Sequence, residues 1–210
     1  MLEKIRFLDR FKQEVSRFDI SKRNDILKWK GNIDSDSKIL DMGSLGMNEL
    51  ENTLNDFLKS SLEGNVIGVD FIEGKGVDTI QNLNKFPYKF KDNSIDLIIA
   101  GEVIEHLSEP YRFLQECYRI LERGGRLIIT TPNMTSIVYI LGIYHNVIGH
   151  GHCHTWNISF FDALIDRTDF KIVYKKLINS LASWDYILEL FTNIFPVFKT
   201  GLFYVLEKSD

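Results

Sequence analysis

The chain has 210 residues, which is enough for one α/β domain with a buried core and too few for two large domains. Apolar residues make up 44% and charged residues 26%, which excludes a disordered or fibrous protein. The net charge of −4 gives no overall positive field, so a nucleic-acid partner is not favoured.

The cysteines and the longest apolar stretch bear on the setting of the protein. Cys117 and Cys153 show no CxxC spacing, and no signal-like segment is recognisable, so a reduced cytoplasmic location is expected. The continuous apolar stretch at residues 137–144 is far shorter than the roughly 20 residues that cross a bilayer. We therefore expect no transmembrane segment.

The first 30 residues predict two amphipathic helices, because apolar side chains recur there at near-helical spacing between charged ones. Nine basic and five acidic side chains give this segment a local charge of +4 in an otherwise acidic protein. We expect residues 1–30 to be a helical extension of a single domain formed by residues 31–210.

After this extension, short apolar runs alternate with helical patterns. Runs that are apolar throughout are typical of strands buried on both faces of a parallel sheet, and the alternation predicts the α/β class. The segment 133–157 has no clear period and predicts a helix or a lid. The other expected elements are strands at 38–41, 66–69, 77–80, 95–100, 126–130, 171–178 and 202–207, and helices after Gly46, at 110–121 before Gly124-Gly125, near 159–167 and near 184–195.

Two features at the predicted strand ends indicate a nucleotide-type ligand. Gly43 and Gly46, in the turn KILDMGSLG, would let the backbone approach a ligand closely, although they could equally serve only to make the turn. Asp70 ends the second strand in VIGVDF, where a carboxylate can accept hydrogen bonds from both hydroxyls of a ribose. The alternative for Asp70 is a residue that starts a turn.

Over residues 38–178 the chain resembles the class I methyltransferases that depend on S-adenosyl-L-methionine (SAM). KILDMGSLG resembles the first motif of the family, GVDTIQNLNKFPYKFKDNSIDLIIAGEVIEHL its central motifs, and YRFLQECYRILERGGRLIITTPN the helix and strand that follow. The resemblance implies a Rossmann-like, seven-stranded, mostly parallel sheet with helices on both faces. It also implies methyl transfer from SAM to an oxygen or nitrogen atom, with S-adenosyl-L-homocysteine (SAH) as the product.

The resemblance also assigns cofactor contacts by position. It places one group of residues along the methionine part, a second at the ribose and adenine, and a third at the pocket floor. In that order the groups are Asp41, Gly43, Ser44 and Gly46; Asp70, Phe71, Asn82 and Leu83; and Ala100, Gly101 and Val103.

Two positions depart from the family pattern. Leu45 stands at a usual glycine, so the loop could follow another path, and Asn82 stands at a usual aspartate. These departures keep open a non-catalytic SAM-binding or regulatory module with the same fold. An NAD-dependent enzyme is disfavoured, because no G-x-G-x-x-G is present.

His106 is the candidate catalytic base, since it follows the fourth strand and its ordinary pKa is near neutrality. The alternative is that it packs or caps the next segment. With Glu102 and Glu105 it forms E-x-x-E-H, which would share one face of a helix. Some small-RNA and ubiquinone-pathway O-methyltransferases resemble this pattern and hold a divalent ion with it.

The histidines of GHGHCHTW alternate along the chain, which would place His150, His152 and His154 on one side of an extended segment. One of them could complete a site for a divalent metal ion, the less favoured interpretation. We expect His152, His154 and Trp156 instead to line the acceptor pocket.

The acceptor itself is not named by the sequence. A small molecule or a glycan- or lipid-type molecule is expected. Cys117 is expected in the core, and so is the aromatic C-terminal segment, for which a homodimer surface is the alternative.

Overall fold

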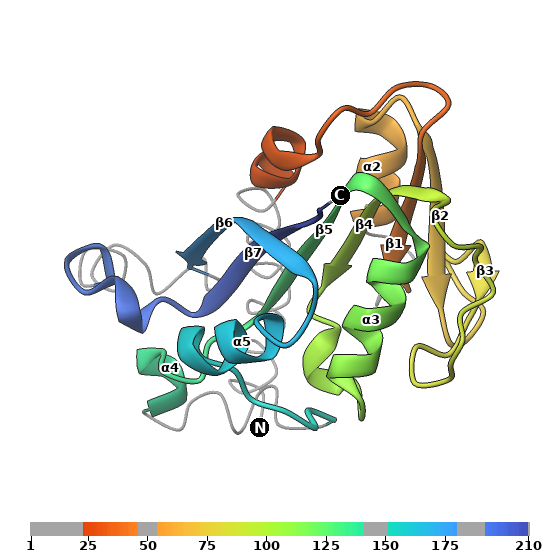
Figure 1. Cartoon of the computed structure of the whole chain (residues 1–210). Coiled ribbons are helices and arrows are strands. Elements are labelled where there is room, and N and C mark those ends of the chain that lie inside the picture. The colour runs from red at the N-terminus through yellow and green to blue at the C-terminus, as the bar shows by residue number, and fades with distance from the viewer. Residues whose placement is uncertain (1–22, 46–53, 141–150, 180–191, 210) are drawn as a thin grey trace, which may run out of the picture.

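The computed structural model describes residues 23–45, 54–140, 151–179 and 192–209, and it shows one twisted sheet with helices against both faces (Figure 1). The seven strands lie in the order β3-β2-β1-β4-β5-β7-β6. Their bounds are β1 Lys38–Met42, β2 Asn65–Asp70, β3 Thr79–Ile80, β4 Ile95–Gly101, β5 Leu121–Pro132, β6 Phe170–Ile178 and β7 Gly201–Lys208. The helices are α2 Leu54–Ser61, α3 Pro110–Ile120, α4 Ile137–Ile140 and α5 Ile158–Ile165, with short 3-10 turns η1 Ile104–His106 and η3 Pro196–Phe198.

The pairing confirms the predicted Rossmann-like, mostly parallel sheet. β1 pairs in parallel with β2 and β4, β2 with β3, and β4 with β5, whereas β7 runs antiparallel to both β5 and β6. The chain moves outward from β1 to β3 and then returns to place β4 on the other side of β1. Ligands of open α/β sheets bind at the carboxyl ends of the strands where the order reverses in this way.

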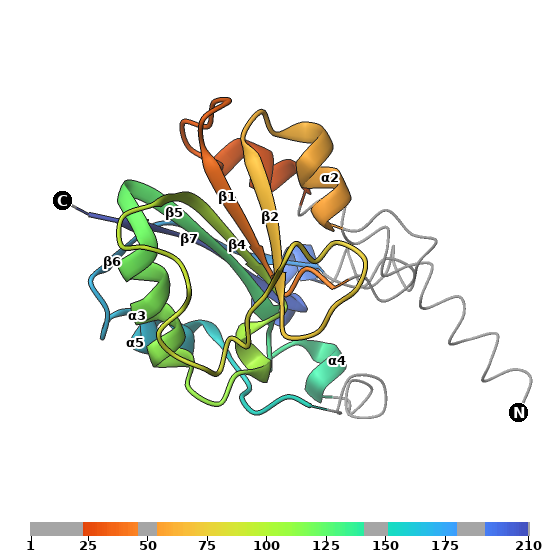
Figure 2. The ribbon, with the colours of Figure 1, turned by 90° about the vertical axis from the view of Figure 1, so that its right-hand side faces the viewer.

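Two apolar layers hold the helices on the sheet. In Figure 2, α3 and α5 lie on one face and α2 lies on the other. The first layer contains Phe113 and Cys117 of α3 with Phe161 of α5, all completely buried, as expected for Cys117. The second layer contains Leu58 of α2 and Ile26, which belongs to a helical stretch at residues 23–29.

The end of α3 lies within one residue of the prediction, but no glycine makes it. The helix was expected to run to about residue 121 and to be stopped by Gly124-Gly125; it ends at Ile120, and both glycines lie within β5. The backbone N–H groups of Asn93 and Ser94 donate to the carbonyls of Arg119 and Ile120, at 3.1 and 2.8 Å. These tertiary bonds satisfy the last carbonyls of the helix, so no glycine is needed to end it.

Other predicted segments are shorter or lie outside the described residues. β3 has two residues instead of four, and α4 is the only helix among the described residues of the segment 133–157, where a helix or lid was expected. Most of the N-terminal extension and of the helix expected near 184–195 is not described, so both stay predictions. In β7, Phe203 and Tyr204 are buried, as expected for the core. Within the described parts of the chain, no helix is long and apolar enough to span a membrane.

Gly43, directly after β1, is constrained twice. Its φ of +81° lies in the left-handed region, and a Cβ atom there would lie 2.3 Å from Val103 Cγ2. Gly124 has a similar φ of +75°, but no described atom lies within 4 Å of a Cβ at that position. Substitution by alanine at Gly124 would therefore report the cost of the backbone conformation alone, and at Gly43 that cost together with the steric overlap.

We expect Gly43→Ala to lower the free energy of unfolding by about 2–4 kcal/mol, because the left-handed penalty and the overlap with Val103 add. Gly124→Ala should cost only about 1–2 kcal/mol, the left-handed penalty alone. Denaturant unfolding of both variants measures the difference. Equal losses would contradict the close contact between Gly43 and Val103.

Candidate active site

The turn after β1 is tied to the end of β2 by three backbone groups. The N–H groups of Gly43 and Ser44 donate to the Val69 carbonyl, at 2.8 and 3.2 Å. The N–H of Leu45 donates to Asp70 Oδ2 at 3.1 Å. These bonds place the predicted methionine-side residues Asp41, Gly43 and Ser44 at the carboxyl edge of the sheet. Gly46, predicted beside them, lies outside the described residues.

Asp70 ends β2, as the sequence predicts. Its Oδ1 accepts from the N–H of Phe71 at 2.7 Å, and each carboxylate oxygen has a second lone pair for a further donor. The Asp70 residue is buried, whereas the Phe71 ring beside it is 62% exposed. A carboxylate and an open aromatic face therefore stand side by side at the strand end.

The departure at Leu45 is accommodated by a second glycine. A Cβ atom on Gly74 would lie 2.3 Å from Leu45 Cδ1, so the leucine side chain occupies the space above the loop that follows β2. The backbone N–H of Leu45 still reaches Asp70. The leucine thus leaves the hydrogen bond between the two strand ends intact.

The segment predicted to meet the adenine edge, with Asn82 and Leu83, is connected to α3 through Tyr88. Leu83 is buried, and its carbonyl accepts from the hydroxyl of Tyr88 at 2.8 Å. The N–H of Tyr88 donates to Glu116 Oε2 at 2.7 Å, and burial raises the pKa of the Tyr88 phenol. Asn82 Oδ1 accepts from the N–H of Asn84 at 2.9 Å, so the amide that replaces the usual aspartate also serves a local turn.

The predicted pocket floor is the end of β4. Ala100 is fully buried, and it pairs with Met42 of β1 and Ile129 of β5. Val103 follows two residues after Gly101 and contacts the position of Gly43 described above. The floor and the methionine-side turn are therefore in direct contact.

The E-x-x-E-H segment is not one helix face, which corrects the prediction. Glu102 has a φ of +57° and precedes the 3-10 turn η1, which contains Glu105 and His106. The hydroxyls of Thr130 and Thr131 donate to Glu102 Oε1 at 2.8 Å and to Glu105 Oε2 at 3.0 Å. The two acids are thus positioned by successive residues of β5.

The histidine-rich segment docks on η1 through its backbone. The N–H groups of Cys153 and His154 both donate to the Glu105 carbonyl, at 2.8 and 3.0 Å. His106 Nδ1 donates to the Gly151 carbonyl at 3.0 Å, so that Nε2 carries the lone pair whenever the ring is neutral. His150 lies outside the described residues.

His152, His154 and Trp156 are less exposed than the residues between them, as the predicted alternation implies, but the two histidines have different partners. The His152 ring lies edge-on to His106 with centroids 4.6 Å apart, whereas His154 stacks on Trp156 at 5.5 Å. Trp156 is buried, and its Nε1 has no hydrogen-bond partner among the described residues. One histidine therefore belongs to the η1 cluster and the other to an aromatic wall.

Three of these side chains form a ligand set that a metal ion could use. The ligand atoms of Glu105, His106 and His152 all lie within 4.8 Å of one another. Burial, and secondarily the charge of His106, lower the pKa of His152, while the charge of Glu102 opposes this shift. The neutral imidazole that coordination requires is therefore favoured.

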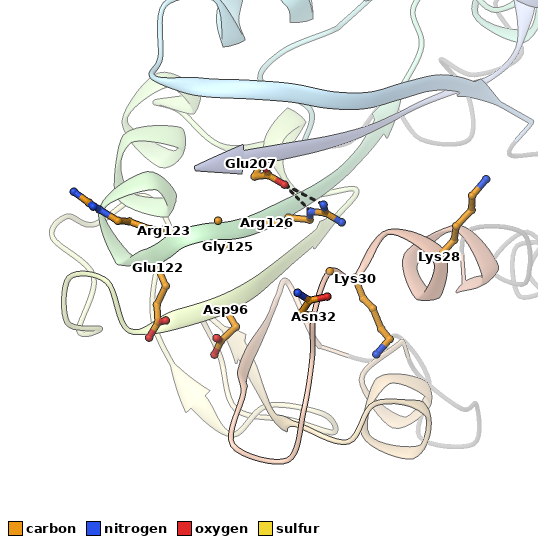
Figure 3. Close-up of a pocket in the computed structure, with 11 residues that line it drawn as sticks. Lys28, Lys30, Asn32, Asp96, Glu122, Arg123, Gly125, Arg126 and Glu207 are labelled. Atoms are coloured by element: carbon orange, nitrogen blue, oxygen red, sulfur yellow. Dashed lines mark hydrogen bonds and ion pairs between the residues drawn. The ribbon is translucent and has the colours of Figure 1, made fainter. Parts of the chain in front are cut away.

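A separate polar cavity of about 570 Å³ lies at the amino ends of β4 and β5 (Figure 3). Asp96 and Arg126 line it, and Arg126 pairs with Glu207 at 3.0 Å. None of the predicted site residues lines this cavity. Sequence reasoning missed Thr130 and Thr131, which donate to Glu102 and Glu105.

Comparisons with known proteins agree with this geometry. A model described as a methyltransferase domain matches residues 53–129. The mitochondrial ubiquinone biosynthesis O-methyltransferase of Rattus norvegicus is 41% identical over 66 residues, which are 29% of this chain and 19% of that protein. A probable SAM-dependent methyltransferase of Mycobacterium tuberculosis is 42% identical over 52 residues, 25% of this chain and 18% of that protein.

Solved structures extend the likeness to the whole fold. A SAM-dependent methyltransferase from Archaeoglobus fulgidus superposes with a TM-score of 0.67 at 16% identity and covers 98% of this chain and 99% of its own. The chain therefore has the fold of the class I SAM-dependent methyltransferases, and its residues 53–129 match a methyltransferase domain. The matched part spans about a fifth of the length of the curated relatives.

SAM is the methyl donor of this class, and the residues at the strand ends fit it. Asp70 offers a carboxylate for two vicinal hydroxyls, and Phe71 offers an exposed ring for a flat base. Ser44 Oγ and Asn55 Oδ1 are buried polar atoms without a hydrogen-bond partner among the described residues. Such acceptors suit the donor-rich ammonium end of an amino acid.

Proposed function

We propose that the chain transfers the methyl group of SAM to an oxygen or nitrogen atom of a small molecule or of a glycan- or lipid-type acceptor. The observation that carries this proposal is the bond between Asp70 and the Leu45 N–H, which joins the ends of β1 and β2 at the point where the strand order reverses. In this proposal the residues that bind the cofactor are those described above at the carboxyl edge of the sheet.

Transfer of a methyl group is an in-line displacement, so most of the rate comes from holding the two reactants in alignment. Residues from β1 to β4 would hold the donor. His152, His154 and Trp156 follow β5 and would face the acceptor, with the Trp156 ring as an apolar wall and its free N–H as a donor. His106 would take the proton of the acceptor through Nε2.

The ligand set of Glu105, His106 and His152 supports a divalent ion on this acceptor side. Their ligand atoms lie close together, the Gly151 carbonyl orients His106, and the Thr131 hydroxyl orients Glu105. Such an ion would bind the acceptor oxygen and lower the pKa of the acceptor hydroxyl. Proton abstraction by His106 would then not be needed. In this version His106 is a metal ligand and not the base.

The donor site is tested by binding of SAH to Asp70→Ala. We expect the dissociation constant to rise about 100-fold or more, since two hydrogen bonds to a charged group contribute roughly 1.5–3 kcal/mol each. Asp96→Asn is the matched control, because Asp96 also accepts a hydrogen bond from a strand N–H, that of Lys38 at 2.7 Å. Asp96 lies at the amino end of β4, whereas Asp70 lies at the carboxyl edge of the sheet.

Calorimetric titration of the two variants measures the affinity, and circular dichroism checks that both are folded. Unchanged SAH affinity in a folded Asp70→Ala protein would contradict the assignment of Asp70 to the ribose. Failure of the unmodified protein to bind SAM or SAH would contradict the proposed function itself.

The metal site is tested by titration of Mn²⁺ into protein treated with a chelator. We expect His152→Ala to weaken Mn²⁺ binding about tenfold or more, the usual scale of losses in metal sites. His154→Ala should leave Mn²⁺ binding unchanged, because His154 stacks on Trp156 and is not in the ligand set. Equal affinities in the two variants would show that the histidine cluster does not hold the ion.

A further inference from the structure

A polar cluster lies in the layer between α2 and the sheet, where apolar packing would otherwise be expected. Asp41 of β1 and Asn55 of α2 are each 1% exposed, and Ser44 is 5% exposed. Asn55 Nδ2 donates to Asp41 Oδ2 at 3.2 Å. Burial of polar groups is costly unless they are hydrogen-bonded, so a buried polar cluster of this kind indicates a role beyond packing.

Gly68 of β2 provides the space for this cluster. It pairs with Asp41 in the sheet, and a Cβ atom there would lie 2.8 Å from Ser44 Oγ and 2.9 Å from Asn55 Nδ2. The same atom would lie 1.7 Å from the Gly76 carbonyl, so any side chain at this position is excluded. The two polar groups therefore approach the β2 backbone where no other residue type would admit them.

The cluster is rich in acceptors. Asn55 uses its amide N–H toward Asp41, while Asn55 Oδ1 and Ser44 Oγ have no hydrogen-bond partner in the described part of the chain. With the Asp41 carboxylate, the cluster combines negative charge with acceptor atoms. The complementary group is a cation that carries several N–H donors, such as a primary ammonium.

We propose that Asn55 is a positioning residue for the methionyl end of SAM. Its amide N–H fixes the Asp41 carboxylate, and its Oδ1 and Ser44 Oγ add acceptors beside it, so that the cluster selects the α-ammonium group of the donor. Ser44 lies in the turn that the family resemblance assigns to the methionine part. The inference rests on the proposed function, because it presupposes that SAM binds at the ends of β1 and β2.

The test compares two ligands that differ only at this end. SAH carries the ammonium and carboxylate of its homocysteine part, whereas 5′-methylthioadenosine carries the same adenosine and a thioether but no amino acid. We expect Asn55→Ala to raise the dissociation constant of SAH about tenfold or more, the scale of a lost hydrogen bond to a charged group. The affinity for 5′-methylthioadenosine should change less than about threefold, since the variant leaves Asp70 and Phe71 in place.

Asp41→Asn carries the test further, because asparagine keeps the shape of aspartate, still accepts the Asn55 N–H and removes the charge. It should also weaken SAH selectively. Because Asn55 acts in part by holding Asp41, the loss of SAH affinity in the double variant should be smaller than the sum of the two single losses. Should Asn55→Ala fail to fold, Asn55→Ser and Asp41→Asn provide the same comparison.

Equal weakening of both ligands would overturn the inference and show that Asn55 only supports the fold. Unchanged binding of both ligands, or additive losses in the double variant, would also overturn it. Each of these outcomes leaves the proposed function standing as long as the unmodified protein binds SAH. If the unmodified protein binds neither SAH nor 5′-methylthioadenosine, the proposed function fails instead.

Discussion

The contact between Gly43 and Val103 is the constraint on which the site depends. Gly43 directly follows β1, and Val103 follows β4. The absence of a side chain at Gly43 lets the two segments come into contact. This contact brings the turn that would hold the donor against the segment that leads into η1. A larger residue at position 43 would separate the proposed donor site from the Glu105–His106 turn. The close approach of two neighbouring strand ends thus brings the proposed donor and acceptor sides together at a single edge of the sheet.

β5 and the histidine-rich segment complete this edge from the other side. Thr130 and Thr131 orient Glu102 and Glu105, and the Glu105 carbonyl receives two N–H groups of the segment that contains His152. Glu105 therefore acts through its side chain and its backbone at once. Because these bonds connect the segment after β4, β5 and the segment after α4, the proposed acceptor side is built from parts that are far apart in the sequence.

The sequence predicted the sheet well because its central strands, such as β1, β4 and β7, are mostly buried on both faces and therefore appear as apolar runs. It also located Asp70 and the glycine turn, since those residues lie at strand ends. It was less accurate where tertiary bonds decide local structure. The end of α3 was placed to within one residue, but Asn93 and Ser94, not a glycine, satisfy its last carbonyls. The segment with Glu102, Glu105 and His106 was expected to be helical, but Glu102 has a left-handed backbone before the 3-10 turn η1. Asn55 could not be found, because its partner Asp41 is adjacent only in the folded chain.

The central claim is that the methyl group of bound SAM faces the cluster of Glu105, His106 and His152. It is tested most directly by the nuclear relaxation of SAM labelled with carbon-13 at the methyl group, measured on the protein with Mn²⁺ and with diamagnetic Mg²⁺. Paramagnetic relaxation falls steeply with distance, so a methyl group that faces the cluster should relax much faster with Mn²⁺ than with Mg²⁺. This enhancement should be lost in His152→Ala. The same relaxation rate with both ions, under conditions where SAM and Mn²⁺ are both bound, would contradict the account.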